Sequence, residues 1–154
     1  MILDIHYKSE NELEKNLSNF ALHAFELDGV PCSCIEAPLQ AFKNQGENFQ
    51  RRICAMDPVK IHKIYKKAFD SDWKRTQRLF WKDKKIKRAS VAYSVQLTRL
   101  FDSAFEQSET YRDALQASVG YELMHSVGKY DMYDTVLTIP EYLYHTYRLR
   151  SHFE

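Results

Sequence analysis

The chain has 154 residues and a net charge of +1, and 44% of its residues are hydrophobic and 14% aromatic. This composition excludes an intrinsically disordered chain, and the length suits one folded domain over residues 1–154. No apolar run approaches the roughly 20 residues of a membrane-spanning helix. The first residues also lack a basic segment followed by an apolar one. We therefore expect a cytoplasmic protein without a membrane contact.

The charge is distributed unevenly along the chain. Residues 58–99 carry thirteen basic and three acidic side chains, a balance of +10, whereas residues 1–57 carry −4 and residues 100–154 carry −5. Two interpretations stay open. The lysines could be solvated helix faces, or they could form a positive wall that attracts the phosphates of a nucleotide or a nucleic acid.

The first predicted elements are a hairpin and a helix. Residues 22–35 alternate loosely in hydrophobicity around Asp28-Gly29, a turn dipeptide, so a short β-hairpin is expected there. From Pro38 the pattern becomes helical, and proline is tolerated in a first turn.

A second helix is predicted to begin at Asp57-Pro58. Aspartate is a good N-cap, and proline suits the first helical position because its missing N–H would be unpaired there. The apolar stripe of this helix would consist of Val59, Ile61, Ile64, Tyr65 and Ala68.

The clearest helix of the chain is predicted to begin at Ser90. Its apolar residues recur at steps of three and four, which places them on one buried face. These residues are Tyr93, Leu97, Leu100, Phe101, Ala104 and Phe105.

Three further segments follow. Residues 109–117 are predicted to be helical, and residues 121–126 could be a strand or a turn. Thr138 is a candidate N-cap with Glu141 three residues later, which predicts a capping box and a C-terminal helix. The expected fold class is α+β, mainly helical, with a short hairpin near the N-terminus.

Three cysteines are an odd number for a disulfide framework and indicate a reducing compartment. Cys32 and Cys34 could bind a soft metal with His23, but no second pair of ligands with zinc spacing follows. Buried thiols are the simpler interpretation. We expect neither a metal nor a cofactor.

Several short segments, in order, resemble the NADAR superfamily. They are Leu17-Ser-Asn-Phe20, Phe25-Glu-Leu-Asp-Gly-Val30, Ser33-Cys-Ile-Glu36, Gln40-Ala-Phe-Lys43, Phe80-Trp-Lys-Asp-Lys-Lys-Ile-Lys-Arg88, Phe105-Glu-Gln-Ser108, Arg112-Asp-Ala-Leu115 and His125-Ser-Val-Gly-Lys-Tyr-Asp131. The family pattern reads approximately Phe-Ser-Asn-Phe, an Asp-Gly turn, Val-Glu-His-x-x-Gln-Ala-x-Lys and Trp-Lys-Gly-x-Lys-Ile-x-Arg. The resemblance covers roughly residues 17–150.

The resemblance implies a cytoplasmic N-glycosidase that hydrolyses a bond between ribose and nitrogen. The implied substrate is nucleic acid with ADP-ribose on its guanine bases, and an ADP-ribosyltransferase toxin would be the counterpart. Alternatives are a small ribosylamino-pyrimidine phosphate of the riboflavin pathway, or a module that binds ADP-ribose or nucleotides without cleaving them.

The resemblance also assigns roles by motif position. Glu36, Trp81 and Asp131 are the candidates for catalysis, and Asp134 is a substitute for Asp131. The candidates for binding the ligand are Asn19, Gln40, Lys43, Lys82 and Arg88.

The chemistry of these residue types suits the reaction. Cleavage of an N-glycosidic bond builds positive charge on the sugar, which a carboxylate stabilises, and a second carboxylate can orient water. An aromatic ring can stack on the base, and lysine and arginine suit a pyrophosphate. Ala37, Pro38 and Asp83 differ from the family pattern, as does Lys66-Lys67 where a Gly-Arg pair is expected. These departures bear on the choice of substrate.

Overall fold

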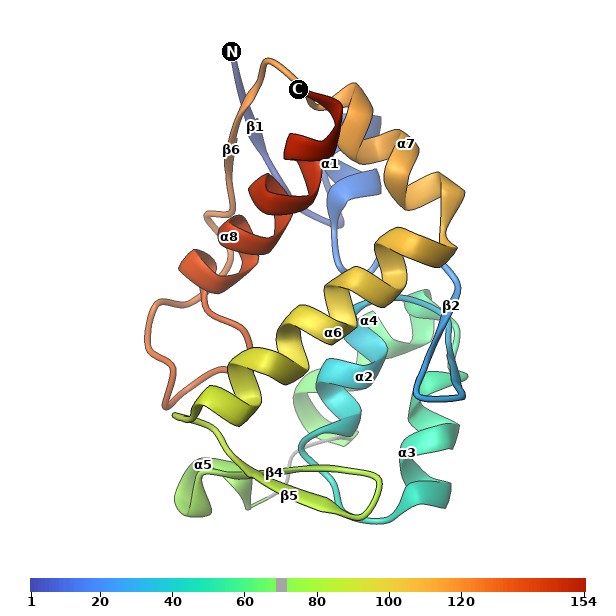
Figure 1. Ribbon diagram of the computed structural model, residues 1–154, viewed down its shortest axis with the longest axis vertical. Coiled ribbons are helices and arrows are strands. Elements are labelled where there is room, and N and C mark those ends of the chain that lie inside the picture. The colour runs from blue at the N-terminus through green and yellow to red at the C-terminus, as the bar shows by residue number, and fades with distance from the viewer. Residues whose placement is uncertain (69–71) are drawn as a thin grey trace.

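The structure, a computed structural model, describes residues 1–68 and 72–154, and the side chains of residues 65–68 lie outside the description (Figure 1). Helices are the predominant regular structure of the described chain. They are α1 (Glu12–Leu17), α2 (Glu36–Ala41), α3 (Glu47–Cys54), α4 (Pro58–Ala68), α5 (Trp73–Thr76), α6 (Val91–Gln107), α7 (Glu109–Ala117) and α8 (Ile139–Arg150), followed by a short 3-10 turn over Ser151–Phe153.

The described strands pair two by two. β1 (Ile2–Asp4) runs parallel to β6 (Glu122–Met124), β2 (Phe25–Leu27) is antiparallel to β3 (Val30–Cys32), and β4 (Arg78–Trp81) is antiparallel to β5 (Lys84–Lys87). The predicted class, mainly helical α+β, is confirmed.

The hairpin predicted around Asp28-Gly29 is formed by β2 and β3. Asp28 and Gly29 both have positive φ, at 50° and 78°, which the two-residue turn of a tight hairpin requires. The turn is also held from outside, because the carboxylate of Asp28 accepts a hydrogen bond from the indole of Trp81 and pairs with Arg99.

The helix starts predicted at Asp57-Pro58, Ser90 and Thr138 are confirmed, whereas α2 begins at Glu36, two residues before the predicted Pro38. The carboxylate of Asp57 accepts from the backbone N–H of Val59 at 2.8 Å, and the Ser90 hydroxyl accepts from Tyr93 at 3.1 Å. Thr138 and Glu141 form the reciprocal capping box. Of the stripe predicted for α4, Ile61 is buried and Ile64 partly buried, Val59 is half exposed, and Tyr65 and Ala68 lie outside the described side chains.

Helix α6 crosses the middle of the molecule and carries much of the core (Figure 1). Its predicted face is buried except for Phe105, which is partly buried and packs against the core. α6 packs against α7 and α8 and against the hairpin of β2 and β3.

Residues 121–126, left open between strand and turn, contain β6. Its partner is the N-terminal strand, with Ile2 opposite Glu122. The segment from residue 125 to 137, which joins β6 to α8, contributes to the cavity described next. Within the described residues, no helix combines the length and apolar character needed to cross a bilayer.

The three cysteines are free and buried. His23 is buried as well, and both ring nitrogens are engaged, one with the Thr110 hydroxyl at 2.8 Å and one with the Asn16 carbonyl at 2.6 Å. This arrangement favours the interpretation of Cys32 and Cys34 as buried thiols.

Candidate functional site

A cavity of about 470 Å³ lies between α2, the start of α5 and the segment 125–137. It is lined by the two acidic side chains Glu36 and Asp134 and by Lys43, Lys74 and Lys129, together with aromatic and amide side chains. Carboxylates and cations that converge on one concave surface are the usual mark of an active site.

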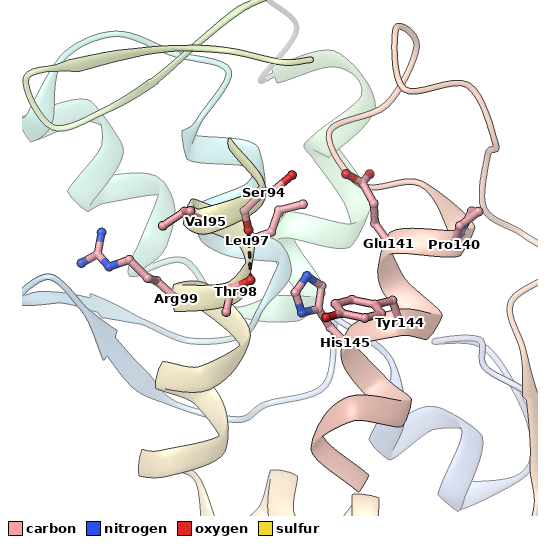
Figure 2. Close-up of a pocket in the computed structure, with 9 residues that line it drawn as sticks. All are labelled: Ser94, Val95, Leu97, Thr98, Arg99, Pro140, Glu141, Tyr144 and His145. Atoms are coloured by element: carbon pink, nitrogen blue, oxygen red, sulfur yellow. Dashed lines mark hydrogen bonds between the residues drawn. The ribbon is translucent and has the colours of Figure 1, made fainter. Parts of the chain in front are cut away.

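A groove of similar volume, about 490 Å³, lies between α6 and α8 (Figure 2). Its walls are mostly apolar, with Val95, Leu97 and Tyr144 among them. Its one carboxylate, Glu141, already pairs with the buried Arg88. The cavity beside α2 is therefore the better candidate for chemistry.

Glu36, the first residue of α2, is held from two directions. Its backbone N–H donates to the carbonyl of Asn19 at 3.0 Å. One helical turn later, the Gln40 amide donates to the Glu36 carboxylate at 2.6 Å. Burial raises the pKa of Glu36 above its usual value, and the hydrogen bonds from Gln40 and Asn19 and the charge of Lys43 only partly oppose this shift.

Two buried acceptors beside Glu36 have no hydrogen-bond partner among the described residues. They are Oδ1 of Asn19 and Oε1 of Gln40, and both residues line the cavity. A buried acceptor without a donor costs about 1–3 kcal/mol. Hydroxyl or amine groups of a ligand in the cavity could supply the missing donors.

The pKa of Asp134 is shifted in the opposite direction to that of Glu36. Its carboxylate pairs with Lys74 at 2.8 Å and with Lys129 at 2.9 Å, and these two lysines lower the pKa of Asp134 to about 2. The same cavity thus holds one carboxyl whose pKa is raised and another whose pKa is lowered, so that Asp134 stays ionised near neutral pH. Such divergent pairs of titratable groups are typical of acid–base sites.

The aromatic side chains of the cavity are Trp73 and Phe20. Trp81, the aromatic residue predicted from the sequence, is not among the lining residues. It lies in the core with 2% of its surface exposed, packs edge-on against Phe42 and donates its indole N–H to Asp28 at 2.8 Å.

Three other predicted site residues also lie outside the cavity lining. Asp131 is exposed and its carboxylate accepts from the backbone of Tyr133 at 2.9 Å. Lys82 donates to the backbone of Asp28, and Arg88 is buried against Glu141. The structure thus brings together Asn19, Glu36, Gln40 and Lys43 but not Trp81, Asp131, Lys82 and Arg88.

Sequence reasoning missed Trp73, Lys74 and Lys129 as lining residues. Lys129 lies within the family-like segment that ends at Asp131, so its position in the sequence could have indicated a site residue. Trp73 and Lys74 belong to none of the quoted segments, and only the position of α5 brings them to the cavity.

His125 lines the cavity in a defined protonation state. Its Nδ1 lies 2.8 Å from the carbonyl of Ile5, which only accepts, so Nδ1 carries the proton. Burial lowers the pKa of His125, and the neutral ring therefore leaves Nε2 as an acceptor. The ring sits close to Gly128, whose position leaves no room for a side chain.

Three of the departures from the family pattern also lie outside the lining, and the side chains of Lys66 and Lys67 lie outside the description. Ala37 and Pro38 are buried in the core, and Asp83 is exposed in the turn between β4 and β5. None of these three side chains therefore forms part of the cavity wall.

Comparison with known proteins places the chain in a family. Residues 13–151 match the family described as bacteriophage protein GP30.3. A 17.1 kDa protein of Enterobacteria phage T4, from the gp30–rIII intergenic region, is 33% identical over 146 residues, which span 88% of this chain and 93% of the T4 protein. The NMR structure of the E. coli protein YbiA has the same fold, with a TM-score of 0.60 at 18% identity over 99% of this chain and 84% of YbiA.

Proposed function

Because the chain belongs to the NADAR family, which includes the bacteriophage GP30.3 proteins, we propose that it is an N-glycosidase that hydrolyses a bond between ribose and a base nitrogen. The family is generally associated with this activity. The substrate proposed is nucleic acid that carries ADP-ribose on guanine, and an ADP-ribosyltransferase acting on guanine would supply it.

The observation that carries the proposal is the pair of carboxyls with opposite pKa shifts in one cavity. The raised pKa of Glu36 suits a group that accepts and returns a proton during a reaction. Asp134 stays ionised and holds Lys74 and Lys129 at the cavity wall. Together with Lys43, these lysines offer three cations to a pyrophosphate.

In the proposed reaction, water attacks the anomeric carbon while the bond from that carbon to the base nitrogen breaks. Ionised Glu36 stabilises the positive charge that builds on the sugar and accepts the proton of the water. The proton then passes to the departing nitrogen, so no charge remains on the base. Phe20, which is partly buried at the cavity wall, supplies a flat apolar surface for the base or the ribose, whereas Trp73, 3% exposed, supports that wall from the core.

The test uses an oligonucleotide with one ADP-ribosylated guanine and measures released ADP-ribose by liquid chromatography. We expect release by the wild type and a loss of at least 100-fold in Glu36→Gln, because general acid–base groups contribute about 10²–10⁴-fold. Glu26→Gln, an exposed glutamate on β2, is the matched control and should stay within about twofold of the wild type. The proposal fails if the wild type releases no ADP-ribose from this substrate.

Two comparisons separate the remaining alternatives. Calorimetric binding of ADP-ribose without any turnover would identify a binding module. Cleavage confined to a ribosylamino-pyrimidine phosphate would identify the small-molecule substrate. Asp134→Asn should raise KM because it releases two lysines, whereas Asp131→Asn should change neither kcat nor KM by more than about twofold.

A further inference from the structure

A second cavity of about 340 Å³ adjoins the candidate site. It shares Lys43 and Trp73 with the first cavity, so these two residues form a common wall. The β4–β5 hairpin supplies much of the remaining lining through Arg78, Phe80 and Lys85. The hairpin therefore borders the same opening as the candidate catalytic residues.

The strand register sorts the side chains of this hairpin into two faces. Leu79, paired with Ile86, is buried and faces the core, as does Trp81. Because side chains alternate along a strand, the other face carries Arg78 and Phe80 on β4 and Lys85 and Lys87 on β5. The three basic residues are exposed and Phe80 is half-buried.

The basic side chains on this outward face form no ion pairs among the described residues, although Asp72, paired with Arg75, also lines the second cavity. Arg78 stands directly opposite Lys87 in the register, and like charges in that position destabilise a hairpin. No ion pair joins Arg78, Lys85 or Lys87 to an acidic side chain in the part of the chain that the structure describes. By contrast, Lys74 and Lys129 at the first cavity are both paired with Asp134.

We propose that the outward face of the β4–β5 hairpin binds the single-stranded polynucleotide that flanks the modified base, an inference that rests on the proposed function. Three cations around an aromatic ring suit a phosphate backbone with one base stacked on Phe80. The wall shared through Lys43 and Trp73 leads from this strand to Glu36. A modified base must leave a duplex to enter such a cavity, which favours a single strand.

The first experiment measures binding apart from catalysis, by fluorescence anisotropy with a labelled, unmodified single-stranded oligonucleotide between low and moderate salt. Lys85→Gln with Lys87→Gln should weaken binding at least tenfold. The slope of log affinity against log salt should fall by about 1.4, since each phosphate contact to single strands contributes about 0.7.

The matched control is Lys84→Gln with Arg52→Gln, which removes the same charge from exposed positions off this face. It should stay within about threefold of the wild type. Circular dichroism verifies that the variants fold. Equal losses in both double variants would show a non-specific charge effect and would overturn the proposed strand-binding face, as would tenfold tighter binding of duplex than of single strand.

A second experiment separates this inference from the proposed function by comparing cleavage of a modified oligonucleotide with that of a modified mononucleotide. We expect Lys85→Gln with Lys87→Gln to raise KM only for the oligonucleotide. If the wild type cleaves both and the double variant behaves identically, the strand-binding face is refuted and the enzyme stands. If hairpin-dependent binding occurs without any cleavage, the enzyme is refuted and the face stands.

Discussion

Arg88 offers a sharp test, because the sequence predicts a ligand-binding residue and the structure shows a buried tether. With 2% of its surface exposed, its guanidinium donates to both carboxylate oxygens of Glu141, at 2.6 and 3.2 Å. Its Nε donates to the carbonyl of Thr135 at 2.9 Å, and the group lies 4.7 Å from the centre of the Tyr93 ring. Since Thr135 lines the cavity, Arg88 holds one of its walls.

The substitution Arg88→Met keeps an unbranched, flexible stem of four heavy atoms and removes the guanidinium contacts. Breaking a buried ion pair costs about 3–5 kcal/mol. The Glu141 side chain keeps 25% of its surface exposed and still accepts from Thr138, which places the loss near the lower limit, at about 3 kcal/mol. For a chain of this size that loss lowers Tm by about 6–12 °C.

Calorimetry or urea unfolding measures this loss. Arg51→Met, which breaks an exposed pair with Glu47, is the control and should cost less than about 1 kcal/mol. Adding Glu141→Gln to Arg88→Met should recover part of the stability, because it removes the unpaired charge. If Arg88→Met has the same free energy of unfolding as the wild type but no longer binds ADP-ribose, the structural role of Arg88 is refuted.

Three further predictions concern the cavity wall and the pH dependence of stability. Gly128→Ala should cost about 1–3 kcal/mol, because an added Cβ would lie 2.6 Å from Ile139 and 2.8 Å from His125; chemical denaturation measures it. Burial and the charge of Arg148 lower the pKa of His145 from 6.5 to about 4. Because the unfolded chain takes up this proton first, the folded protein should lose stability on the order of 2 kcal/mol as the pH falls from 6.5 to 4. The variant His145→Phe should reduce this loss. Because the pKa of Glu36 is raised, the contribution of this one group to stability falls as the pH rises above 4.5. Glu36→Gln should therefore melt higher at pH 7 than the wild type, by a margin that shrinks toward pH 4.

Each of these three has a clear contrary outcome. An unchanged free energy of unfolding in Gly128→Ala would show that the segment 125–137 can shift to accommodate the added methyl group. An acid transition with the same slope in His145→Phe and the wild type would assign that transition to other groups. A lower melting temperature of Glu36→Gln at pH 7 would show that the ionised carboxylate is stabilised where it lies.

Local signals of the sequence predicted local structure well. Asp28-Gly29 specifies its turn through backbone conformations that few residues adopt, and the caps at Ser90 and Thr138 act within one helical turn. The N-terminal strand β1 and the β4–β5 hairpin were not predicted. The partner of β1 is about 120 residues away, so its pairing leaves no trace in the neighbouring sequence.

The residues of the candidate site also divide into those that the sequence indicated and those that only the structure revealed. The sequence by itself determined the family resemblance, the proximity of Glu36, Gln40 and Lys43 on and just after one helix, and the basic character of residues 58–99. Only the tertiary structure decided which tryptophan and which aspartate reach the cavity. Trp73 and Trp81 have the same chemistry, and Asp131 and Asp134 are three residues apart, but the register of β4 turns Trp81 into the core while α5 places Trp73 and Lys74 beside α2 and Asp134. A side chain's type is local information, whereas the direction in which it faces depends on packing between distant segments.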